Sequence, residues 1–221
     1  MKKRTSPILN PGYKTVGDIT VESGRTCSSQ LGWYAFAGKF CKGDIVLDVG
    51  CGLGKGLELL SKEALKASGI DLDERLRKEC VEIKDISKVG TKTVDTVVAM
   101  DVIEHVENDV DFAKDLVRVA RKQVIVSTPN YTFMRCKWPY HVREYTPGEL
   151  VGLFRDAGQV ELYKGSNSGD DVFPVKYLWV YFLINELRMF FLTAFIMRCL
   201  NRILPYPMKI HPHLLIRVLL R

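Results

Sequence analysis

Apolar and polar positions alternate along the middle of the chain in short blocks that predict strands and helices in turn. Residues 45–49 read as a buried strand, and apolar positions in 55–66 recur at the spacing of one helix face. Further strands are predicted at 68–72, 81–84, 94–100, 124–127 and 160–163, and further helices at 30–40, 109–122 and 147–157. Strands that alternate with helices indicate an α/β fold, with a mostly parallel sheet covered on both faces.

The pattern changes after residue 171. Apolar runs at 177–184 and 189–197 are separated by Asn185, Glu186 and Arg188, and neither reaches the ~18–20 uncharged residues that a transmembrane helix needs. They are expected to form helices that pack on the domain, or an interfacial segment that lies in a membrane surface. The predicted organisation is an N-terminal segment (1–26), a domain (27–170) and an apolar helical extension (171–221).

Charge distinguishes the extension further. The 221 residues include 32 Lys and Arg and 26 Asp and Glu, a formal net charge of +6. Seven basic residues and one acid follow residue 171, so the whole excess lies there. We therefore expect residues 176–221 to contact an anionic membrane surface, with an extra helical layer or a homodimer interface as the alternative. Nucleic acid is disfavoured because the segment is too apolar for a groove that follows phosphates.

Cysteine usage and the first residues bear on location. The six cysteines, at 27, 41, 51, 80, 136 and 199, form neither a Cys-x-x-Cys pair nor a zinc-binding spacing. Reduced thiols and no metal site are expected. The basic residues 2–4 are followed by Pro, Gly, Asn and Asp where a signal peptide requires an apolar stretch. The predicted location is the cytoplasm, with peripheral binding to the inner membrane face as an option.

The strongest chemical signal follows the first strand. Residues 46–56 read VLDVGCGLGKG, with Asp48 inside the strand and glycines at 50, 52, 54 and 56 before a helix. Such a turn brings bare backbone and a helix N-terminus close to a nucleotide-like ligand. A P-loop is excluded because position 49 is Val and position 56 is Gly, where that motif needs Gly and Ser or Thr.

Acidic residues discriminate between NAD and S-adenosylmethionine as the ligand. Asp71, at the end of the second strand, can accept both ribose hydroxyls of either one. Asp48 favours a ligand with a cationic ammonium and sulfonium, because the carboxylate would repel a pyrophosphate. Asp85 is placed to accept from an adenine amino group with Ile86 over a ring face, or is a plain loop acid. S-adenosylmethionine is thus the expected cofactor, and an NAD-dependent oxidoreductase is a weaker alternative.

The glycine turn resembles the first motif of the class I S-adenosylmethionine-dependent methyltransferases. GIDLD at 69–73 resembles the second motif of that class, and three later segments resemble in particular its small-molecule, type 11/12-like subgroup: VDTVVAMDVIEHVEN at 94–108, VIVSTPN at 124–130 and HVREYTPGEL at 141–150. The resemblance implies a Rossmann-like, mostly parallel sheet of the seven-strand type with helices on both faces. It also implies a set of cofactor contacts: Gly50, Gly52 and Gly54 around the methionine moiety, Asp71 with Leu72 at the ribose, Asp85 near the adenine, and Met100 and Asp101 beside the sulfonium.

Methyl transfer to an oxygen acceptor needs a base. His105 and His141 follow strands at the edge expected to hold the cofactor, and imidazole can take a hydroxyl proton near neutral pH. Both are candidate catalytic residues. Alternatively, His141 and Arg143 fix their loop to the sheet, for instance through Glu144, and His105 only helps to begin a helix. The expected function is methyl transfer to an oxygen of a small or lipid- or glycan-linked acceptor; a methyltransferase-like module without turnover is the alternative.

Overall fold

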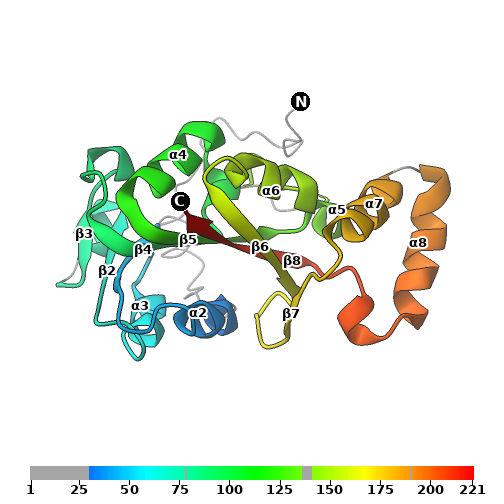
Figure 1. The fold of residues 1–221 in the computed structure, drawn as a ribbon, viewed down its shortest axis with the longest axis horizontal. Coiled ribbons are helices and arrows are strands. Elements are labelled where there is room, and N and C mark those ends of the chain that lie inside the picture. Colours follow the sequence, from blue (N-terminus) through cyan, green and yellow to red (C-terminus); the bar gives the residue numbers. More distant parts are fainter. Residues whose placement is uncertain (1–29, 78, 136–140, 190) are drawn as a thin grey trace.

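The computed structural model describes residues 30–221 except 78, 136–140 and 190. The predicted N-terminal segment 1–26 lies outside the described residues. An eight-stranded sheet runs through the molecule in the order β3-β2-β1-β4-β5-β8-β6-β7 (Figure 1). The strands are β1 (Ile45–Val49), β2 (Lys66–Asp71), β3 (Val81–Ile83), β4 (Val94–Met100), β5 (Ala120–Pro129), β6 (Gly158–Gly165), β7 (Val172–Pro174) and β8 (His213–Leu220).

Strand direction divides the sheet into two parts. β1 to β5 are mutually parallel, whereas β8 pairs antiparallel with both β5 and β6, and β7 pairs antiparallel with β6. The α/β class and the mostly parallel, Rossmann-like sheet are confirmed. The short strand β7 gives the sheet eight strands where seven were expected.

Helices cover both faces of the sheet. α2 (Leu31–Gly38) and α3 (Lys55–Leu60) lie on one face, and α4 (Asp109–Val119) and α6 (Pro147–Phe154) lie on the other (Figure 1). α6 begins with the capping box that Thr146 and Glu149 form. Short helical turns and one short helix follow several strands: η2 (Glu74–Leu76), η3 (Ile86–Lys88), η4 (Ile103–His105) and α5 (Tyr131–Met134).

Successive side chains of the central strands enter opposite layers of the core. Val46 packs in the cluster that contains Trp33 and Leu57, whereas Leu47 packs in the cluster that contains Leu116 and Leu150. This follows from the two-residue period of a strand. β1, β4, β5 and β8 each contribute to both clusters, which explains why these strands read as continuous apolar runs.

The helical extension predicted for residues 171–221 is wrong at its C-terminal end, where residues 213–220 form a strand. α7 (Leu178–Met189), α8 (Phe191–Ile203) and η5 (Tyr206–Met208) form one end of the molecule, but β8 lies inside the sheet between β5 and β6 (Figure 1). A short apolar run does not by itself distinguish a buried strand from a buried helix. No helix among the described residues is both long enough and apolar enough to cross a membrane.

Candidate active site

A pocket of about 250 Å³ lies where the parallel strands β1, β2 and β4 end. Five of the residues expected to contact a cofactor line it, together with one of the two candidate bases. The lining residues are Val49, Gly50, Ile70, Asp71, Leu72, Lys84, Asp85, Ile86, Val102, His105, Val106 and Phe112. The carboxyl edge of a parallel sheet is the usual position of a ligand in this architecture.

The glycine turn after β1 depends on left-handed backbone at alternate positions. Gly50, Gly52 and Gly54 have φ values of 72°, 54° and 73°, a region that favours glycine. A Cβ atom on Gly50 would also lie 2.6 Å from a methyl carbon of Val102. Gly50 therefore satisfies both a backbone and a packing requirement at the pocket wall, whereas Gly52 and Gly54 are not among the lining residues.

Asp71 connects this turn to the end of β2. Its carboxylate accepts from the backbone N of Gly52 at 2.9 Å and from that of Asp73 at 3.1 Å. An ionised carboxylate has about four lone-pair sites, so these two bonds leave acceptor capacity for hydroxyl groups in the pocket.

Asp85 lies at the other end of the pocket, before η3. Its side chain accepts from the backbone N of Ser87 at 2.8 Å. This hydrogen bonding lowers the pKa of Asp85 below its ordinary value. Asp85 is therefore a charged acceptor at neutral pH, and Ile86 beside it adds an apolar wall.

Asp48 is completely buried behind the turn and does not line the pocket. The hydroxyl of Tyr34, from α2, donates to its Oδ2 at 3.0 Å, while its Oδ1 has no hydrogen-bond partner in the described part of the chain. Burial raises the pKa of Asp48 to about 8, although the Tyr34 hydrogen bond acts in the opposite direction. A buried acid with one unpaired oxygen fits a cationic group of a ligand bound at the turn.

Asp101 follows β4 in left-handed backbone, with φ 54°. Ser127 Oγ donates to its Oδ1 at 2.6 Å, His213 Nε2 lies 2.6 Å from the same oxygen, and Gln30 also donates to the carboxylate. Burial alone would raise the pKa of Asp101, but His213 and Ser127 lower it below its ordinary value. Met100 packs instead in the core cluster with Trp33 and does not line the pocket.

His213 is a candidate site residue that the sequence reading missed. It begins β8 and meets Asp101 across 112 residues of sequence. Its ring also packs against Trp33, with the centroids 5.0 Å apart. In the sequence, His213 is recognisable only as a histidine before an apolar run. The pairing of β8 with β5 is what brings it to Asp101.

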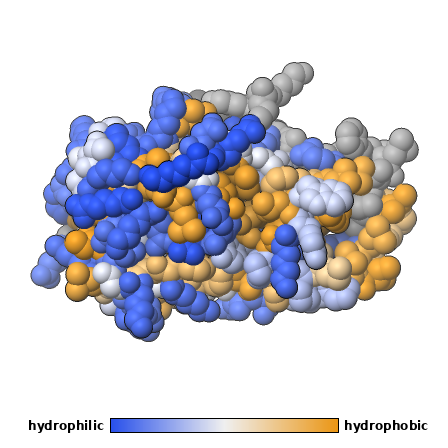
Figure 2. All heavy atoms as spheres, viewed as in Figure 1, coloured by the Kyte–Doolittle hydropathy of each residue, from blue (hydrophilic) through white to orange (hydrophobic). Residues whose placement is uncertain are grey.

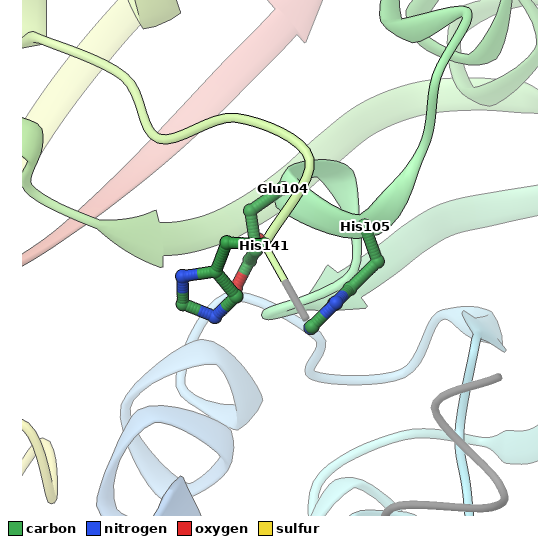
Figure 3. A group of neighbouring side chains, drawn as sticks. All are labelled: Glu104, His105 and His141. Atoms are coloured by element: carbon green, nitrogen blue, oxygen red, sulfur yellow. The ribbon is translucent and has the colours of Figure 1, made fainter. Parts of the chain in front are cut away.

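Both candidate bases lie in one cluster with Glu104 (Figure 3). The rings of His105 and His141 are edge to face, with their centroids 5.0 Å apart. Glu104 is completely buried, and its Oε2 accepts from Thr128 Oγ1 at 3.0 Å. His141 Nδ1 lies 2.7 Å from Glu144 Oε1, which is the contact expected if Glu144 fixes this loop.

Arg143 holds the same segment to α4. Its guanidinium pairs with the carboxylate of Asp109, to which the Tyr145 hydroxyl also donates at 3.0 Å. The backbone N of Arg143 donates to the carbonyl of Glu104 at 3.1 Å. These buried contacts fix the position of His141 relative to η4.

Comparisons with known proteins agree with this geometry. The family model described as methionine biosynthesis protein MetW matches residues 36–151. A Mycobacterium tuberculosis protein named "Probable S-adenosylmethionine-dependent methyltransferase" is 32% identical over 168 residues, which are 68% of this chain and 61% of that protein. A relative from Mycolicibacterium smegmatis with the same description is 35% identical over 135 residues, 53% of this chain and 52% of its own. The chain thus spans between half and two thirds of the length of these relatives.

Solved structures share the fold at low sequence identity. A methyltransferase from Archaeoglobus fulgidus has a TM-score of 0.57 and 20% identity, over 83% of this chain and 89% of its own. The plantazolicin methyltransferase BpumL, solved with a desmethyl substrate analogue and SAH, has a TM-score of 0.58 and 15% identity, over 93% and 90%. A methyltransferase from Thermotoga maritima has a TM-score of 0.63 and 12% identity, over 92% and 97%.

Proposed function

Because the chain belongs to the MetW family, among the class I S-adenosylmethionine-dependent methyltransferases, we propose that it moves a methyl group from S-adenosylmethionine to an oxygen of a small or lipid- or glycan-linked acceptor. The choice of S-adenosylmethionine as cofactor rests mainly on the pocket at the carboxyl ends of β1, β2 and β4. It combines the left-handed glycine turn with two acids, Asp71 and Asp85.

The residues around the pocket suit the different parts of this cofactor. Asp71 has acceptor capacity for ribose hydroxyls, and Asp85 with Ile86 suits an adenine. The buried Oδ1 of Asp48 lacks a hydrogen-bond partner among the described residues and suits a cationic methionine end. Without such a cation Asp48 is mostly protonated at pH 7, because its pKa is about 8, so the repulsion of a pyrophosphate expected from the sequence is weak.

S-adenosylmethionine, when bound, supplies an electrophilic methyl group. The protein's residues then have to orient the two reactants, exclude water and accept the proton that an oxygen acceptor releases. His105 lines the pocket and His141 is oriented by Glu144, so the acceptor proton is expected to leave at this cluster.

A second cavity supports an acceptor with an anionic group. It measures about 520 Å³ and is lined by Phe133, Arg198, Asn201, Arg202, Tyr206, Lys209, Ile210, His211 and Pro212. Three of these residues are cationic, and none of the described lining residues is acidic. Burial lowers the pKa of His211 to about 4, and the positive charge of Lys164 acts in the same direction. The imidazole is therefore neutral. A phosphate on a lipid- or glycan-linked acceptor matches this lining.

The helices beside this cavity support a membrane location for such an acceptor. Trp179 on α7, and Phe195 and Ile203 on α8, are 71%, 72% and 79% exposed. Figure 2 shows hydrophobic residues gathered over the end of the molecule that α7 and α8 form. Aromatic and aliphatic side chains beside Arg198 and Arg202 suit an anionic membrane surface, and a homodimer interface is the alternative occupant.

The proposed function is tested by titration and by labelling. Isothermal titration of the purified protein is expected to detect S-adenosylmethionine and S-adenosylhomocysteine binding, weakened at least tenfold in Asp71→Ala. Incubation with methyl-labelled donor and a lipid and small-molecule extract is expected to label an acceptor. Tight NAD binding without sulfonium binding would overturn the cofactor assignment, and cofactor binding without any labelled product would favour the module without turnover.

A further inference from the structure

The cluster of Glu104, His105 and His141 has the composition of a metal site. One ligand atom from each residue lies within 4.8 Å of the other two, and the three side chains are neighbours in Figure 3. Two imidazoles and a carboxylate are a common ligand set for divalent transition-metal ions, to which water or substrate adds the remaining ligands. The cysteine spacing alone predicts no metal site, because none of the three residues of this cluster is a cysteine.

The carboxylate of Glu104 provides an independent sign of a missing partner. The residue is completely buried, and only its Oε2 is engaged, by Thr128 Oγ1. Its Oε1 has no hydrogen-bond partner in the part of the chain that the structure describes. A buried carboxyl oxygen without a hydrogen-bond partner is costly. A cation between Glu104 and the two imidazoles would remove that cost.

His141 is held as a metal-binding histidine usually is. Its Nδ1 is 2.7 Å from Oε1 of the buried Glu144, which leaves Nε2 as the nitrogen available for an ion. A carboxylate behind a ligating imidazole fixes the ring orientation and raises its basicity. The main-chain bond from Arg143 to Glu104 holds the two ligand segments together.

We propose that Glu104, His105 and His141 bind one divalent transition-metal ion, of the class of Zn²⁺ or Mn²⁺, at the wall of the cofactor pocket. His105 belongs to that wall, so open coordination positions would face the space where donor and acceptor meet. The role in catalysis rests on the proposed function, and with the ion bound the two histidines serve as ligands instead of bases: a metal-bound acceptor hydroxyl would release its proton to water and keep the electron pair on oxygen. Ion binding itself does not depend on the identity of the acceptor.

The test measures metal binding directly on the full chain, without a polyhistidine tag. After chelator treatment, isothermal titration with Zn²⁺ and with Mn²⁺ should give one saturable site, and Co²⁺ should give visible absorption bands of a protein-bound ion. His105→Ala and His141→Ala are each expected to weaken binding at least tenfold, and Glu144→Gln to weaken it 10–100-fold as a residue that orients a ligand. His211→Gln, a buried histidine of the second cavity that lies outside the cluster, is the control for metal binding alone and should leave the affinity for Zn²⁺ and Mn²⁺ unchanged.

Each outcome separates the metal site from the proposed function. Absence of a saturable site in the wild-type chain, or equal affinity in the wild type, His105→Ala and His141→Ala with circular dichroism unchanged, overturns the metal site. Metal binding without methyl transfer to any acceptor would support the site and count against the proposed function. Methyl transfer that persists unchanged after complete removal of metal would leave the function standing and refute the catalytic role of the ion.

Discussion

The two halves of the sheet edge are assembled over different distances in the sequence. At the β1–β3 side, the glycine turn meets Asp71 across 19 residues. At the β5–β8 side, Asp101 meets His213 across 112 residues, and Asn130 donates to the carbonyl of His211 across 81. The β1–β3 side, proposed for the cofactor, is thus assembled from residues close in sequence, whereas the β5–β8 side exists only after the chain has folded.

The β1–β3 side therefore depends on local backbone conformation, whereas the β5–β8 side depends on buried contacts between residues that are distant in the sequence. Substitutions at the first side should therefore act mainly through the turn and the cofactor. Substitutions at the second side should act mainly through the stability of the fold and the position of the histidine cluster.

The largest expected effect concerns the buried ion pair between Arg143 and Asp109. Arg143→Ala should lower the free energy of unfolding by about 3–5 kcal/mol, because it leaves the buried Asp109 without its cation. Lys114→Ala removes an exposed ion pair with Asp111 and should cost about 0–1 kcal/mol. Urea unfolding followed by fluorescence measures both. Equal losses in the two variants would contradict the larger contribution expected from the buried pair.

The next effect is a pH dependence on the cofactor side. The folded pKa of Asp48 is raised to about 8, so the folded state holds a proton that the unfolded state has released. The contribution of Asp48 to stability is therefore greatest at low pH and falls as pH rises towards 8. The free energy of unfolding of the wild type relative to Asp48→Asn should decrease by about 2 kcal/mol between pH 6 and 8. Denaturant unfolding at several pH values tests this, and a difference that stays constant with pH would refute it.

A smaller loss of stability is expected at the glycine turn, with a larger effect on binding. Gly50→Ala forces a side chain into left-handed backbone and against Val102, and should destabilise the fold by about 1–2 kcal/mol. S-adenosylmethionine affinity should fall at least tenfold in isothermal titration. Gly152→Ala, in α6, is the control: nothing lies within 4 Å of the added Cβ, and helix propensity predicts a stability gain of about 0.5–1 kcal/mol. An unchanged affinity in Gly50→Ala would count against a cofactor at this turn.

The smallest effect on stability is expected on α8. Phe195→Ser and Ile203→Ser alter exposed side chains and should change the free energy of unfolding by less than about 0.5 kcal/mol. Both should nevertheless reduce flotation with vesicles that contain anionic lipid. Equal flotation of the variants and the wild type would oppose membrane binding, and loss of a dimer in size-exclusion chromatography would favour the homodimer instead.

The sequence predicted most where the site is local. Gly50, Asp71, Asp85 and Ile86 come together in one pocket because they follow three strands that lie side by side. His213 was not predictable, because its partner is chosen by the pairing of β8 with β5. The apolar run of β8 suits either a buried helix or a buried strand, so the sequence alone predicts a helical extension where the structure has a strand.

The contacts of the basic residues within 176–221 were equally hard to predict from the sequence. Arg217 was expected to meet anionic headgroups, but its guanidinium donates to Gln123 at 2.7 Å and to Glu161 at 3.2 Å. Its charge is therefore used between neighbouring strands of the sheet. Arg198 and Arg202 line the second cavity instead, so only part of the positive charge of residues 176–221 is available to a membrane or an anionic acceptor.

The position of β8 has a consequence for how the protein forms during synthesis. β5 and β6 are both complete long before residues 213–220 leave the ribosome, yet each depends on β8 for its second neighbour in the sheet. Until then, two apolar strand edges stand open, a state that favours pairing with other chains. Gly158 allows the final closure, because a Cβ there would lie 1.9 Å from the carbonyl oxygen of Leu219. A nascent chain halted before β8 should therefore need chaperones, whereas one halted after it should not.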